Sequence, residues 1–188
     1  MLMAEAPVSK GCLFMYSIIN KVGQGGIFMD AEKLERALQI AEKYLPDSEL
    51  SKELKKTHKQ KSEQQEMKKY IKMITQNEFS SREEIENLDV PFKDDLLFFY
   101  DMGNFKPTDQ EKEKVRELTE LLDLLDGERF MAEKREVEQE IEIYKFKERL
   151  SMQSWDEVVD TTSADAIEKY PKFRKIFRQF DALLDLVR

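Results

Sequence analysis

The chain has 188 residues, of which 37% are charged and 40% hydrophobic, and its net charge is −8 at pH 7. This acidity disfavours nonspecific nucleic-acid binding by the whole molecule, because such binding depends on neutralising phosphates. A single cysteine, Cys12, excludes an internal disulfide and favours a reducing, cytoplasmic location. Glycine and proline are scarce, at six and five residues, which favours long helices over many short elements.

Residues 1–29 differ in character from the rest and hold four of the six glycines. The apolar residues between Cys12 and Ile19 fit a short helix and, nearly as well, an edge strand. The GQGG stretch at 23–26 lacks the Gly-Lys-Ser/Thr ending of a phosphate-binding loop and the third glycine of a dinucleotide fingerprint. We therefore interpret GQGG as a turn and expect no cofactor.

Two helices are predicted between residues 30 and 78. Asp30 is a good N-cap for the first, which ends at Pro46. The second carries a candidate basic patch made of Lys52, Lys55, Lys56, Lys59 and Lys61. No large apolar side chain occurs between Lys55 and Glu66, which predicts either an exposed, protruding helix or a flexible break. The lysines also raise the alternative of a nucleic-acid-associated regulator.

An acidic stretch follows, with fourteen acidic against five basic residues from Glu83 to Asp126. It either pairs with the flanking basic segments or forms an exposed field, as in a phage or mobile-element decoy that mimics nucleic acid. Leu96–Tyr100 is predicted to be the densest part of the core. Thr108 and Glu111 have the spacing of a capping box. The helix after it has an apolar seam typical of bundles and coiled coils, made of Val115, Leu118, Leu122 and Leu125.

The seam is interrupted at 126–127, where glycine predicts a hinge. A charged helix is expected over about 128–150, and we hypothesise that it pairs with the helix at about 48–78 as a coiled-coil-like arm. Residues ~80–125 and ~155–188 are expected to build a compact bundle.

The final helix has apolar residues on one face and basic residues over its first half. The apolar stripe consists of Phe173, Ile176, Phe177, Phe180, Leu184 and Val187. Three interpretations are open for it: a core helix that covers Leu96–Tyr100 while its basic half meets the acidic stretch, a helix that docks on a partner, or a helix on a membrane surface. We favour the core helix and keep the stripe as a candidate partner interface.

Catalytic and metal-binding patterns are missing. His58 is the only histidine and lies in the most polar part of the chain, which disfavours zinc sites, di-iron sites and catalytic triads. No apolar run approaches the ~20 residues of a membrane span.

The sequence therefore predicts an all-α, irregular helical bundle of about six or seven helices. Residues 1–29 form a separate segment and 30–188 one helical domain. We expect a non-enzymatic, cytoplasmic interaction protein (an adaptor, assembly factor or small regulator) that binds protein partners or itself.

Overall fold

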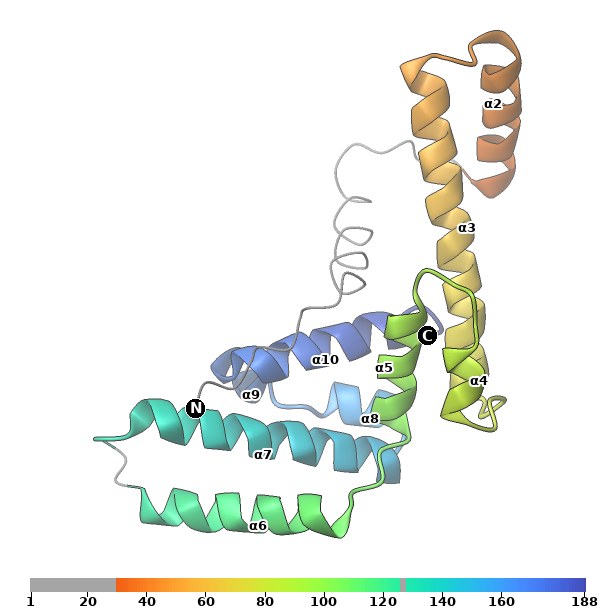
Figure 1. The fold of residues 1–188 in the computed structure, drawn as a ribbon. Helices are drawn as coiled ribbons and strands as arrows, with labels where there is room; N and C mark the ends of the chain where they lie inside the picture. The colour runs from red at the N-terminus through yellow and green to blue at the C-terminus, as the bar shows by residue number, and fades with distance from the viewer. Residues whose placement is uncertain (1–29, 126–127) are drawn as a thin grey trace. The chain divides into compact units, whose positions relative to one another are not determined.

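The computed structural model describes residues 30–125 and 128–188 (Figure 1). All nine elements in these ranges are helices, so the all-α prediction is confirmed there, with more helices than the six or seven expected. In chain order they are α2 (Ala31–Tyr44), α3 (Glu49–Thr75), α4 (Arg82–Glu86), α5 (Lys93–Gly103), α6 (Asp109–Leu124), α7 (Met131–Met152), α8 (Trp155–Asp160), α9 (Ala164–Lys169) and α10 (Pro171–Leu184). The predictions for residues 1–29 and for a hinge at 126–127 lie outside the described residues.

The chain divides into two units. Of the described residues, the first unit contains 30–80 together with Asn87–Leu96, and the second contains Ser81–Glu86, 97–125 and 128–188. The division falls within α5, whose first residues belong to the first unit and whose remainder belongs to the second.

In the first unit, α2 and α3 form an antiparallel hairpin. Asp30 caps α2 by accepting a hydrogen bond from the Lys33 N–H at 2.8 Å, and Ser48 caps α3 through the Ser51 N–H at 3.1 Å. Small and branched side chains close the contact between the helices: Leu34, Ala41 and Leu54 are buried, and Ala37 and Leu38 pack against them.

α3 is one continuous helix that buries different faces along its length. Ser51 and Leu54 are buried in its first half, and Met67, Ile71 and Ile74 in its second half. Because a helix turns about 100° per residue, Leu54 and Ile74 point to nearly opposite sides. The apolar-free stretch 55–66 is therefore where the buried face changes sides, and the flexible break allowed by the sequence does not occur.

Ser51 offers a test of the α2–α3 contact, because its hydroxyl is fully buried and has no hydrogen-bond partner among the described residues. Replacing Ser51 with alanine removes an unsatisfied polar group and should raise the free energy of unfolding by about 1 kcal/mol. Ser62→Ala, at an exposed position of the same helix, measures the gain in helix propensity alone. Urea unfolding followed by circular dichroism should show a larger gain for Ser51→Ala, and an equal gain would contradict the prediction.

The second unit has an aromatic core built by α5, α7, α8 and α10. Phe180 is fully buried, and its ring centroid lies 4.8 Å from Phe99, 5.9 Å from Phe146 and 5.9 Å from Trp155. The Trp155 Nε1–H donates to the Leu150 carbonyl at 3.0 Å, which fixes the indole. These contacts come from sequence positions far apart and join four helices into one unit.

α6 and α7 form a second hairpin, in the second unit. The predicted capping box is confirmed: the Glu111 N–H donates to Thr108 Oγ at 3.2 Å, and the Thr108 N–H donates to Glu111 Oε2 at 2.8 Å. No residue of α6 is buried, since its seam residues are only half-buried. α3 packs on α2 in the first unit, and α7 packs on α6 in the second. These contacts do not test whether α3 and α7 pair as an arm, which stays a prediction.

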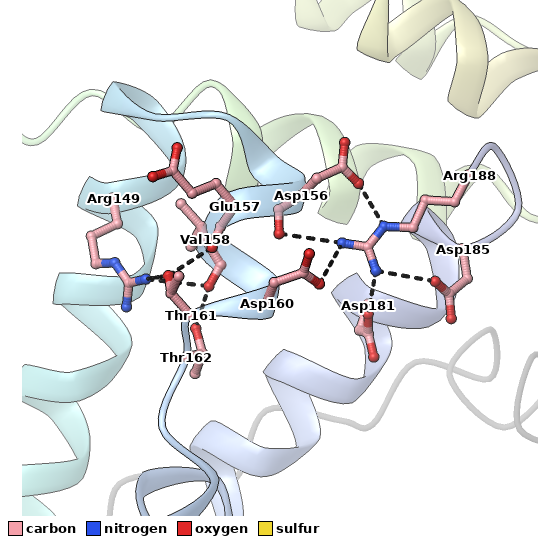
Figure 2. A network of polar contacts seen from close by, with 10 residues as sticks. All are labelled: Arg149, Asp156, Glu157, Val158, Asp160, Thr161, Thr162, Asp181, Asp185 and Arg188. Carbon is pink, nitrogen blue, oxygen red and sulfur yellow. Dashed lines mark hydrogen bonds and ion pairs between the residues drawn. The ribbon is translucent and has the colours of Figure 1, made fainter.

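Two arginines fix α8 to its neighbours (Figure 2). The Arg149 guanidinium of α7 donates to the Val158 carbonyl at 3.2 Å and to Thr161 Oγ at 2.7 Å. The Arg188 guanidinium contacts carboxylates at both ends of α8 and in the last turns of α10, namely Asp156, Asp160, Asp181 and Asp185. Burial, reinforced by the neighbouring Asp185, raises the pKa of Asp181. The Arg188 contacts therefore connect the C-terminal residue of the chain to α8 and to the end of α10.

Candidate interaction surfaces

Exposed apolar side chains concentrate at the closed ends of the two hairpins. Nine large hydrophobic residues are exposed in the described part of the chain: Ile40, Tyr44, Leu45, Leu50, Leu121, Leu124, Phe130, Met131 and Met152. Eight of them fall within residues 40–50 and 121–131, where α2 turns into α3 and where the chain passes from α6 to α7. We call the two sets the α2–α3 end (Ile40, Tyr44, Leu45, Leu50) and the α6–α7 end (Leu121, Leu124, Phe130, Met131). Contiguous exposed apolar groups are typical of interaction sites.

The α2–α3 end presents its apolar side chains from an ordered turn. The Leu45 N–H donates to the Ala41 carbonyl at 2.8 Å, and the Ser48 hydroxyl donates to the Leu45 carbonyl at 2.8 Å. Ile40 and Tyr44 are four residues apart and therefore share one face of α2. Tyr44 is 67% exposed although its neighbours in the turn are fixed by hydrogen bonds. An exposed tyrosine supplies a large contact area with only two side-chain torsions to fix, so it loses little conformational entropy on binding.

The α6–α7 end has the most exposed apolar residue of the two sets, Leu124, at 81%. Met131, in the first turn of α7, is 61% exposed. The Arg129 guanidinium lies 5.4 Å from the centroid of the Phe130 ring. Acidic residues dominate the adjoining helix, since α6 contains six acids and three bases. This end therefore combines uncovered leucines with a negative surface.

A cavity of about 150 Å³ lies between α6 and α7. Its apolar lining comes from Phe105, Val115, Leu118, Ile143 and Tyr144, and its charged rim from Glu111, Lys114, Glu140 and Lys147. Two of the rim charges partly neutralise one another, since Lys114 Nζ lies 3.9 Å from Glu140 Oε2. Lys147 Nζ lies over the Phe105 ring, 5.4 Å from its centroid.

Two titratable groups of this cavity have shifted pKa values. Hydrogen bonds from the Thr108 N–H and hydroxyl lower the pKa of Glu111, which therefore stays ionised near neutral pH. Burial, followed by the nearby Glu148 carboxylate, raises the pKa of Tyr144. Both shifts move the pKa of the group away from neutral pH, so Glu111 is ionised and Tyr144 is protonated there.

The structure separates the residues of the candidate basic patch. Lys52, Lys56 and Lys59 recur at spacings of four and three, so they share one face of α3. Lys55 Nζ pairs with Glu42 of α2 at 3.2 Å and so lies beside that helix. Lys61 also interacts with other described residues. By the same spacing Lys55 also lies on this face, so four of the five predicted lysines share one side of α3 and Lys61 lies on the opposite side.

The candidate interface of the final helix lies mostly inside the second unit. Phe173, Phe177, Phe180 and Leu184 are buried, whereas Ile176 and Val187 are half-buried. The predicted cover of Leu96–Tyr100 is seen for Phe99, which stacks on Phe180. α10 is thus a core helix of its unit, and its stripe offers a partner little apolar surface.

The basic half of α10 pairs with different acids than expected. In the contacts that the structure shows, the basic residues from Lys169 to Arg178 pair with α7 and α9 instead of the acidic stretch at 83–126. Lys169 contacts Glu138 at 2.8 Å and Lys172 contacts Glu136 at 3.3 Å, both on α7. Arg174 and Arg178 contact Glu168 on α9. Acids of the neighbouring helices α7 and α9 therefore take the place of the acidic stretch that the sequence predicted as the partner.

Glu138 allows a test of this pairing, because it accepts hydrogen bonds from Lys169 Nζ at 2.8 Å and from the Tyr170 hydroxyl at 2.9 Å. The Lys169 bond lowers the pKa of Glu138. Its stabilisation is therefore present above the unfolded pKa of about 4.3 and is lost as pH falls through the folded pKa. Glu138→Gln should cost about 1 kcal/mol at pH 7, screened by solvent, and little near pH 3.

The matched control for this prediction is Glu133→Gln, an exposed position of the same helix. Denaturant unfolding at several pH values should show a pH-dependent difference for Glu138→Gln only. A difference that is the same at pH 3 and pH 7 would show that packing, and not the carboxylate charge, is responsible.

Metal-binding groups and membrane-spanning helices are not found in the ranges 30–125 and 128–188. In those ranges no group of three or more His, Cys, Asp or Glu side chains is arranged to hold a metal ion. None of the helices there combines the length and the apolar content that a bilayer crossing requires. His58 is half-buried on α3, and Cys12 lies outside the described residues.

No protein-family model, curated protein or solved structure matches the chain. Function must therefore be argued from the residues of this chain. The two hairpin ends were not predicted as sites from the sequence. A signal was present, however: Leu45 and Phe130 stand where a turn usually has polar residues or glycine.

Proposed function

We propose that this chain is a non-enzymatic interaction protein, such as an adaptor, assembly factor or small regulator, that binds protein partners or itself through its helical hairpins. The observation that supports the proposal is the concentration of eight of the nine exposed large apolar residues at the two hairpin ends. Scattered apolar residues would need no explanation, whereas two ordered, uncovered groups are typical of binding sites. The charges beside them suit the polar rim of a protein interface.

Site-specific photo-crosslinking in cells tests this function directly. A photoreactive phenylalanine analogue would replace Tyr44 or Leu124, one at each hairpin end, and Met152 as the control. Met152 is 74% exposed but lies outside both ends. We expect discrete crosslinked species from Tyr44 or Leu124 and none from Met152. Equal labelling at all three positions, or no crosslinked species, would contradict the proposal.

Light scattering of the purified chain distinguishes self-association from binding of another protein. If a second copy is the partner, the crosslinked species has twice the mass of the chain and the molar mass in solution rises with concentration. Tyr44→Glu and Leu124→Glu should then restore the monomer, because each places a charge in an apolar contact.

Nucleic-acid association through α3 is a second candidate, supported by the stripe of Lys52, Lys56 and Lys59. The Lys52 and Lys59 side chains are 68% and 78% exposed although each lies near a carboxylate, so these ammonium groups are available to phosphates. This candidate would be supported by binding to DNA or RNA that weakens steeply with added salt. The triple variant Lys52→Ala/Lys56→Ala/Lys59→Ala should abolish that binding. Absence of binding at low salt would exclude it.

The decoy interpretation, in which the acidic stretch mimics nucleic acid, stays a prediction with less support. Several of its acids are paired within their own unit, such as Asp101 with Arg82 at 2.9 Å and Glu120 with Arg116 at 3.0 Å. A continuous negative field is therefore interrupted by guanidinium groups.

A further inference from the structure

The outer face of α6 carries apolar and acidic residues that α7 does not cover. Val115 and Leu118 line the cavity shared with α7 and therefore face that helix. Glu117, Leu121 and Leu124 recur at spacings of four and three, so they form a different face of α6. Leu121 and Leu124 are 40% and 81% exposed. α6 thus has one half-buried face against α7 and a second apolar stripe without a cover in the described structure.

The charge of this second face is negative. Arg116 is already engaged by Glu113 and by Glu120. Glu117 and Glu120 come four residues before Leu121 and Leu124, so both exposed carboxylates share this face, and Glu117 forms no ion pair with any residue in the described ranges. A partner with positive charges around apolar anchors would therefore be attracted, and a like-charged partner would be repelled.

The cavity supplies a place for one anchor. Its volume of about 150 Å³ is enough for a benzene-sized group. From Glu111, at the cavity, to Leu124, at the end of the helix, α6 rises by roughly 20 Å, which corresponds to nearly four turns of a partner helix. Lys114, on the rim of the cavity, and Leu121 are seven residues apart and lie on the same side of α6, so an amphipathic helix can place one anchor in the cavity and others against Leu121 and Leu124.

We propose that α6 and the cavity it shares with α7 bind a basic amphipathic helix of a partner protein. The inference rests on the proposed function, because it names the chemistry of the partner at one of the two hairpin ends. Leu121 and Leu124 supply the apolar contact, Glu117 and Glu120 attract the lysine or arginine side chains of the partner, and the cavity receives a Phe or Leu side chain.

A synthetic peptide tests this with the full chain. The probe is a 16-residue peptide with Leu at helical spacing, one central Phe and Lys at the remaining positions, and its binding is measured by fluorescence anisotropy. One control peptide has the same composition in shuffled order, and the other has Ala in place of the Phe. We expect the probe to bind and both controls to bind roughly tenfold more weakly, because they lose the apolar stripe or the anchor.

Variants of the chain locate the binding site. Leu121→Ala/Leu124→Ala should weaken probe binding roughly tenfold, and Glu117→Gln/Glu120→Gln should weaken it several-fold and reduce its dependence on salt. All four side chains are at the surface, so the fold should be unaffected. Tyr44→Ala/Leu45→Ala, at the α2–α3 end, is the matched control and should bind as the wild type does.

Three results would overturn the inference: no binding of the probe, equal binding of the shuffled peptide, or equal binding by the α6 variants. The shuffled peptide matters most, because equal binding would show charge attraction without a helical site. If the inference fails while Leu124 still crosslinks a protein in cells, the proposed function stands and the partner has other chemistry. If neither hairpin end crosslinks, both proposals fail.

Discussion

Replacing Phe180 with alanine is expected to destabilise the second unit by about 3–5 kcal/mol, the usual cost of deleting a buried phenylalanine side chain. The ring is fully buried and contacts Phe99, Phe146 and Trp155, which come from three other helices. Its loss therefore leaves a cavity where four helices meet. Since whole domains are stable by only about 5–15 kcal/mol, the loss is a large fraction of the total.

The measurement uses Trp155, the only tryptophan of the chain, which lies in the second unit. Its fluorescence during urea unfolding follows that unit alone, which matters because a chain of two units need not unfold in one step. Ile176→Ala, at a half-buried position of the same helix, is the control and should cost about 1 kcal/mol. Equal costs for the two variants would show that the aromatic cluster does not hold the unit together.

Local signals in the sequence were sufficient to predict individual helices. Asp30 and the Thr108–Glu111 capping box both act where the sequence indicated. Such signals depend on hydrogen bonds and backbone geometry within one turn of helix, so neighbouring residues determine them. The burial of α10 could also be predicted, because its apolar residues share one face.

Features that depend on the partner of a helix could not be predicted. Leu45 continues the apolar spacing of α2 as well as Ala41 does, but Ala41 is buried and Leu45 is 53% exposed. Periodicity shows which face is apolar, but it does not show where the neighbouring helix ends. The change of buried face along α3 has the same origin, because each half has different neighbours. The candidate hairpin ends were missed for this reason.

A close contact between distant residues was equally hidden. Gly103, the last residue of α5, lies directly under the indole of Trp155. A Cβ atom at this position would lie 2.6 Å from Trp155 Cη2 and 2.8 Å from Cε2, and closer still to Cζ2. In the sequence, Gly103 looks only like a helix end. Its packing role depends on a residue in another helix.

Gly103→Ala is therefore expected to destabilise the second unit by about 2–3 kcal/mol through overpacking. The sign of the change in unfolding free energy is informative, because replacing glycine with alanine within a helix normally stabilises a protein by about 1 kcal/mol. The indole cannot easily move away from the added methyl group, because its Nε1–H donates to the Leu150 carbonyl and the Phe99 ring packs edge-on against it, with 5.2 Å between ring centroids. Urea unfolding should show the loss, and Trp155 emission should shift to longer wavelength as the ring becomes more hydrated.

A double-mutant cycle separates this clash from any other effect of the methyl group. In a Trp155→Phe background the smaller ring leaves space at Gly103, so Gly103→Ala should cost less than half as much as in the wild type. Unfolding is then followed by circular dichroism, because the tryptophan is absent. If Gly103→Ala costs the same in both backgrounds, the indole is not what excludes a side chain, and the backbone of α5 itself must require glycine.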